Sequence, residues 1–133
     1  MGAGSPGAQA PYRLTIREHP SYLHARADGE LTPGNALRFL EDAYAACVQG
    51  GRGALLLEMC LEGPSLDAGS IFEVISQRVA DGSKLAKIAY VECGGGDPAK
   101  ARFAETVAVN RGVNVRLFPD TGAAARWLAA RDI

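Results

Sequence analysis

The spacing of apolar and polar positions along the chain predicts five strands. Residues Tyr12–Glu18, "YRLTIRE", alternate between the two classes, as a half-buried strand does. A second strand is expected over residues 22–27, joined to the first by a turn at 19–21 and paired antiparallel with it. Residues 54–60, "ALLLEMC", form a mostly continuous apolar run, which suits a strand buried on both faces. Two further strands are expected over residues 85–91 and 113–118.

Segments whose apolar residues have helical spacing lie between these strands. The first helix is expected to begin at Thr32-Pro33, because Thr can cap a helix and Pro fits its first position, and to end at Gly50-Gly51. Its expected apolar stripe is Ala36, Leu37, Leu40, Ala43, Tyr44, Cys47 and Val48.

Three more helices follow. One comes after the polar segment "SLDAGS", another runs from Asp97-Pro98 to Arg111-Gly112, and the last spans about residues 121–131. Their expected apolar faces are Ile71, Phe72, Ile75 and Val79; Phe103, Ala104, Val107 and Ala108; and Ala124, Trp127 and Leu128. Trp127 should anchor the last helix to the sheet.

The order β-β-α-β-α-β-α-β-α predicts an α/β fold with a mixed, mostly parallel five-stranded sheet, four helices and right-handed crossovers. Residues 1–11, rich in Gly, Ala, Ser and Pro, are expected to be a flexible N-terminal tail, and residues 12–133 a single domain. The core strand residues are expected to include Leu55, Leu57, Ile88, Tyr90, Val115 and Leu117.

Composition and charge narrow the range of functions expected for this chain. The chain has 133 residues, 47% of them hydrophobic, which fits one globular domain. With 14 Lys+Arg, 15 Asp+Glu and no charge run, it lacks the basic cluster of a nucleic-acid surface. No apolar run approaches the ~18 residues of a membrane span, and the N-terminus lacks a secretory signal. We therefore expect a cytoplasmic protein with no nucleic-acid or membrane partner.

Metal and nucleotide chemistry is not indicated. The histidines His19 and His24 and the cysteines Cys47, Cys60 and Cys93 lack metal-ligand spacing, so no metal or cofactor is expected. The odd number of cysteines favours free thiols in a reducing compartment. Residues 94–100, "GGGDPAK", follow a strand and open a helix, but their spacing matches no phosphate-binding motif.

The most informative stretch is "CLEGPSLDAGSIFEVIS", residues 60–76. Ser70 and Glu73 have the spacing of a capping box, in which each side chain accepts from the backbone N–H of the other residue. That structural role is sufficient to explain Ser70 without any functional one.

The chain resembles the anti-sigma-factor antagonist (STAS) family and its STAS-like branch. The resemblance covers roughly residues 12–130 in element order and is clearest in "GELTPGNALRFLEDAYAAC", "GALLLEMCLEGPSLDAGSIFEVI" and "FAETVAVNRGVNVRLFPDTGAAARWL". In that family a buried strand leads to Asp-Ser-Ser/Thr-Gly, whose second hydroxyl residue is phosphorylated by a partner kinase.

The family's motif is altered in this chain. Asp67 matches the Asp, but Ala68 and Gly69 stand at the two hydroxyl positions and Ser70 stands at the glycine. The resemblance leaves two alternatives: Ser70 or Ser65 replaces the phosphoacceptor, or the domain has kept the fold without the switch. The switch or partner-binding loop is accordingly predicted to comprise Glu62, Ser65, Asp67, Gly69 and Ser70.

Three functions follow in order of preference. The first is a non-enzymatic regulatory domain that binds a protein partner through this loop. Whether the domain also forms a homodimer is left open by the sequence. The second is a small-molecule or lipid binding module with "CGGGD", residues 93–97, lining the pocket. The third is an enzyme with Cys93 as nucleophile; no base for it is identifiable, and a buried structural cysteine is the favoured interpretation.

Overall fold

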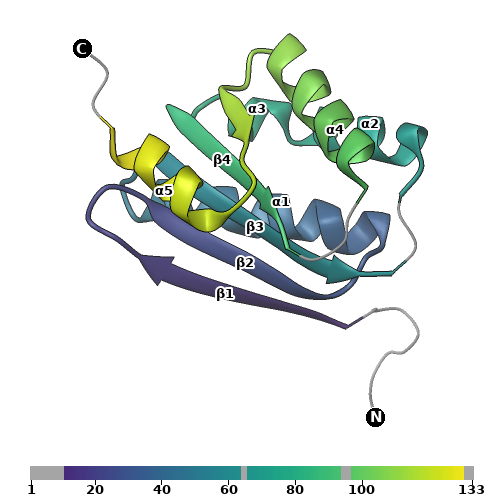
Figure 1. The fold of residues 1–133 in the computed structure, drawn as a ribbon, viewed down its shortest axis with the longest axis horizontal. Coiled ribbons are helices and arrows are strands. Elements are labelled where there is room, and N and C mark those ends of the chain that lie inside the picture. The colour runs from purple at the N-terminus through teal and green to yellow at the C-terminus, as the bar shows by residue number, and fades with distance from the viewer. Residues whose placement is uncertain (1–10, 64–65, 94–96, 131–133) are drawn as a thin grey trace.

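The structure, a computed structural model, describes residues 11–63, 66–93 and 97–130. Its strands are β1 (Tyr12–Glu18), β2 (Leu23–Glu30), β3 (Ala54–Glu62), β4 (Lys87–Glu92) and β5 (Val115–Leu117). Its helices are α1 (Pro33–Gln49), α2 (Ala68–Gln77), α3 (Val79–Gly82), α4 (Pro98–Asn110) and α5 (Thr121–Ala129) (Figure 1). None of these helices combines the length and the apolar character needed to cross a membrane.

The five strands form one sheet in the order β1-β2-β3-β4-β5. β1 pairs antiparallel with β2, and every other neighbouring pair is parallel. This confirms the predicted mixed, mostly parallel α/β sheet. The number of helices was underestimated by one, because Arg78, with φ −110° and ψ 9°, separates the short helix α3 from α2.

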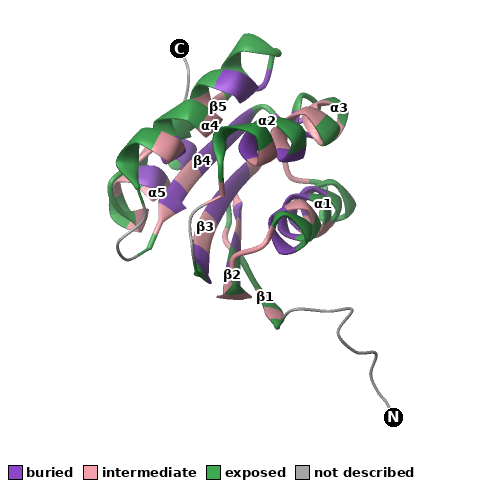
Figure 2. Ribbon diagram, turned by 90° about the vertical axis from the view of Figure 1, so that its right-hand side faces the viewer, coloured by how far each residue is buried: buried purple, intermediate pink, exposed green. Residues whose placement is uncertain are grey.

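Helices cover both faces of the sheet unequally. α1, α2, α3 and α4 lie on one face and α5 on the other, and Figure 2 shows the buried strands between them. The two faces have separate cores, since alternate residues of β3 point in opposite directions: Leu55 and Leu57 pack toward α1, whereas Leu56 packs against Ala124 and Leu128 of α5. Of the strand residues expected in the core, Leu55, Leu57 and Ile88 are buried, and Tyr90, Val115 and Leu117 are half-buried.

The buried stripe of α1 differs from the predicted one. Phe39 is fully buried and Asn35 is 3% exposed, although neither was predicted to be buried, whereas Val48 is 54% exposed. Asn35 is buried because its amide donates to the carbonyls of Pro11 (3.1 Å) and Glu30 (2.8 Å). Thr32 caps the helix as predicted, accepting from the Asn35 N–H.

Two aromatic side chains predicted to face the core instead face solvent. Phe72 of α2 is 42% exposed and Phe103 of α4 is 37% exposed. α2 buries Ile71 and Val74, so its contact face is turned relative to the predicted one. The guanidinium of Arg111 lies over one face of the Phe72 ring, 4.5 Å from its centroid.

α5 is held to the sheet by more than Trp127. The indole is half-buried against Phe118, with ring centroids 5.3 Å apart. Lys87 of β4, 8% exposed, donates from Nζ to the carbonyls of Trp127 (2.9 Å) and Ala130 (3.0 Å). The sheet thus supplies a side-chain donor to two carbonyl groups at the carboxyl end of α5.

Candidate functional site

A cavity of about 510 Å³ lies between the sheet and α1, α2 and α4. Its sheet side is formed by Leu57, Met59, Leu61, Tyr90 and Val115. Its helix side is formed by apolar side chains, among them Leu40, Tyr44, Ile71, Val74, Ile75, Ala104 and Ala108. This volume lies within the range of pockets that enclose small organic ligands, which are also mostly apolar.

The cavity opens at the carboxyl ends of β3 and β4. Its exposed lining residues gather there: Glu62 at the end of β3 with Gly63 after it, and Cys93 and Asp97 after β4. Gly63 has φ +142°, a conformation that L side chains rarely adopt, and it turns the chain out of β3. Open α/β sheets bind ligands at this edge.

A few polar groups lie among the apolar ones. The Tyr90 hydroxyl donates to a Glu92 carboxylate oxygen at 2.8 Å. Burial, and then the neighbouring Glu92 charge, raise the pKa of Tyr90 well above 10, so the phenol stays a neutral donor. Lys100 of α4 donates from Nζ to the Leu66 carbonyl at 2.6 Å, which ties α4 to the segment before α2.

The structure places most of the predicted loop beside this opening. Glu62 is the last residue of β3 and lines the cavity, while Asp67, Gly69 and Ser70 lie at the start of α2. Ser65 lies outside the described residues. "CGGGD" contributes Cys93 and Asp97 to the lining, as the small-molecule alternative predicted, and Gly94 to Gly96 lie outside the described residues.

The predicted capping box at Ser70 is wrong. Asp67 is the N-cap of α2, and its Oδ1 accepts from the Ser70 N–H at 2.7 Å. Ser70 lies inside the first turn of α2, three residues after this cap. The Ser70 N–H and hydroxyl, and then the positive charge of Lys100, lower the pKa of Asp67.

This geometry reverses the expected importance of the two residues for stability. We expect Asp67→Ala to lower the melting temperature more than Ser70→Ala, because the first removes the cap and the second only one of its donors. Because the pKa of Asp67 is lowered on folding, its contribution should be present at neutral pH and disappear as the pH falls through its folded pKa. Thermal melts of both variants at pH 7 and pH 3 check this, and a larger loss for Ser70→Ala would contradict the assignment.

The interpretation of all three cysteines as free thiols is also wrong. Cys60 and Cys93 form a disulfide with Cα atoms 5.2 Å apart, and only the buried Cys47 is free among the described residues. Met59 pairs with Glu92 in the parallel β3–β4 ladder, so the two cysteines are the next pair along. The available signal was that Cys60 ends one predicted strand and Cys93 lies two residues past the end of the next.

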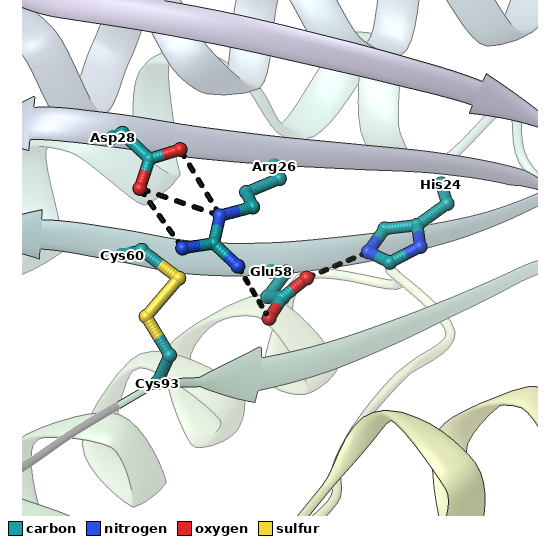
Figure 3. Close-up of polar contacts among 6 residues, drawn as sticks. All are labelled: His24, Arg26, Asp28, Glu58, Cys60 and Cys93. Atoms are coloured by element: carbon teal, nitrogen blue, oxygen red, sulfur yellow. Dashed lines mark hydrogen bonds and ion pairs between the residues drawn. A yellow bond between two sulfur atoms is a disulfide. The ribbon is translucent and has the colours of Figure 1, made fainter.

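A second polar group occupies the opposite face of the sheet. His24 Nε2 lies 2.8 Å from Glu58 Oε1, and Arg26 bridges Asp28 (3.0 Å) and Glu58 (3.5 Å) (Figure 3). Arg26 contacts both carboxylates of this group, which fits a structural role. Within the described part of the chain, no group of three or more His, Cys, Asp or Glu is placed to hold a metal ion.

Comparison with known proteins identifies the fold. No family model and no curated protein matches the sequence. An uncharacterized DUF3478-family protein with a SpoIIAA-like fold from Shewanella loihica PV-4 matches 95% of this chain and 100% of its own, with a TM-score of 0.56 and 15% identity. The protein TM1081, solved by NMR, matches 98% and 100% of the two chains, with a TM-score of 0.51 and 14% identity.

These likenesses extend over nearly the whole chain and agree with the strand order and helix placement described above. The sequence resemblance to the STAS family is therefore confirmed at the level of structure: this chain has the SpoIIAA-like (STAS) fold.

Proposed function

We propose that this chain is a non-enzymatic binding domain that holds a mostly apolar small molecule in the cavity beneath α2 and α4. The observation that carries the proposal is the cavity itself, about 510 Å³ and lined largely by Leu, Ile, Val and Ala side chains. Filling such a space with an apolar ligand removes both ligand and lining surface from water, which is the main driving force for binding of this kind.

The cysteine chemistry supports a non-enzymatic role. Cys93 was the candidate nucleophile, but its sulfur is bonded to Cys60. A disulfide sulfur is not a thiolate and cannot attack a substrate as a nucleophile. The other cysteine, Cys47, is fully buried in α1, where burial raises the pKa of its thiol.

The cavity proposal is tested by filling the space. Ala104 of α4 lines the cavity, so Ala104→Phe should abolish binding of a neutral apolar dye such as Nile red, measured by fluorescence titration. Ala45→Phe is the matched control, because Ala45 is an exposed helical alanine on α1. Equal dye binding by the wild type and both variants would place the dye elsewhere and contradict the proposal.

Regulation through a protein partner is a second candidate, supported by the SpoIIAA-like fold and by the exposed ring of Phe72. Phe72 lies five residues after the N-cap Asp67 on α2, beside the predicted loop. Exposed aromatic side chains are common anchors of protein interfaces. A partner that docks there should be lost on Phe72→Ser and retained on Phe103→Ser, the corresponding change at an exposed phenylalanine of α4; equal retention by both variants would remove this candidate.

A further inference from the structure

The charged groups around the cavity are predominantly acidic. Among the described lining residues are four carboxylates and two cations: Glu62, Glu92, Asp97, Glu105, Arg78 and Lys100. Both cations already make polar contacts within the chain, but the buried Nε of Arg78 has no hydrogen-bond partner among the described residues. Arg78 lies 3.4 Å from Asp81 and 3.7 Å from Glu41, and Lys100 donates to a backbone carbonyl at 2.6 Å.

The helix N-termini near the opening are also occupied. The first N–H groups of α2 and α4 would attract an anion if they were free. Instead, Asp67 accepts from the Ser70 N–H at 2.7 Å and Asp97 accepts from the Ala99 N–H at 3.0 Å. Each helix start therefore carries a carboxylate of the chain itself, and a negatively charged ligand would meet repulsion there.

Glu92 is the carboxylate best placed to meet a ligand. It follows Tyr90 by two residues on β4, on the same face of the sheet, and is half-buried within the cavity lining. One of its oxygens, Oε2, accepts from the Tyr90 hydroxyl at 2.8 Å. Among the described residues no other hydrogen bond reaches the Glu92 carboxylate, so Oε1 is left to accept from a ligand. The carboxylates Asp97 and Glu105, by contrast, accept from backbone N–H groups of Ala99 and Leu117.

We infer that the ligand of the proposed cavity site is an amphiphile with an apolar chain and a cationic, hydrogen-bond-donating head group that pairs with Glu92. The inference rests on the proposed function and adds the ligand's charge to it. The apolar chain fills the space between the sheet and α2, and the head group lies between Tyr90 and the opening. A charge-assisted hydrogen bond to a half-buried carboxylate is stronger than one between neutral groups.

The test compares three probes with the same twelve-carbon chain: dodecylammonium, dodecanol and dodecanoate. Their affinities are measured by calorimetry at pH 7, at concentrations where each is monomeric. Dodecylammonium should bind at least about tenfold more tightly than dodecanoate, with dodecanol between them, because hydrogen bonds to charged groups contribute enough to give such a ratio.

The variant Glu92→Gln tests whether the preference for a cationic probe comes from Glu92 itself or from the overall negative charge around the cavity. The variant keeps an oxygen for the Tyr90 hydroxyl and removes the negative charge, so the preference for dodecylammonium should fall about tenfold. Glu58→Gln is the matched control: it removes the same charge from a carboxylate on the opposite face of the sheet and should leave the preference unchanged.

The outcomes test the cationic head group separately from the apolar cavity. Equal or tighter binding of dodecanoate by the wild type overturns the cationic head group and leaves the apolar cavity function standing. Failure of all three probes to bind overturns the cavity function and this inference with it. The wild-type comparison decides the inference even if Glu92→Gln does not fold.

Discussion

Phe39→Ala is expected to lower the free energy of unfolding by about 3–5 kcal/mol, the range for removing a buried aromatic side chain. Phe39 of α1 has no exposed surface and belongs to the core that α1 forms with β2 and β3. Its loss removes apolar burial and leaves a void that the rigid sheet can close only in part. Urea unfolding followed by circular dichroism measures the change.

Val48→Ala is the matched control for this experiment. Val48 is on the same helix but 54% exposed, so its truncation should change the unfolding free energy by no more than about 0.5 kcal/mol. The sequence pattern ranked the two residues in the opposite order, with Val48 in the apolar stripe and Phe39 outside it. Similar losses for both variants would mean that α1 is rotated on the sheet relative to the structure described above.

The elements themselves were predictable because their signals are local. Alternation in Tyr12–Glu18, the apolar run at the start of β3 and the Pro residues after Thr32 and Asp97 depend only on neighbouring residues. Strand ends were less predictable: β2 continues to Glu30 and β3 to Glu62, past the last residues of the apolar patterns. Pairing extends them, since Glu30 lies opposite Glu62 in the parallel ladder.

Structural details that depend on contacts between distant segments were not predictable from the spacing of apolar and polar residues. Asn35 is polar, and only the carbonyls of Pro11 and Glu30 make its burial favourable. Asp67 and Ser70 both have the chemistry of an N-cap, and local rules could not choose between them. The structure assigns the cap to Asp67, beside Leu66, whose carbonyl is bound by Lys100 from the other helix.

The candidate site was predictable at its opening but not in its interior. Glu62, Asp67 and Ser70 follow a buried strand, so their position at the carboxyl edge of the sheet follows from the fold class. The cavity behind them depends on how far α2 and α4 lie from Leu57 and Met59 of β3, a distance that no sequence pattern contains. The same limit applies to Tyr90 and Glu92, which looked like ordinary strand residues.

The disulfide between Cys60 and Cys93 is expected to contribute about 2–4 kcal/mol to stability. It joins residues 33 positions apart, and the closed loop contains all of α2 and α3. In the chain-entropy account, this constraint removes conformations from the unfolded chain, so reduction should lower the free energy of unfolding without rearranging the fold. Urea unfolding with and without a phosphine reductant measures the difference.

The double variant Cys60→Ser/Cys93→Ser supplies the control, because it has no disulfide to lose. Its stability should be unaffected by the reductant and close to that of the reduced wild type. Alkylation of the unfolded, unreduced wild type should label Cys47 alone, since the structure leaves only that thiol free among the described residues. Labelling of three cysteines, or a wild-type unfolding free energy that does not change on adding the reductant, would contradict the disulfide.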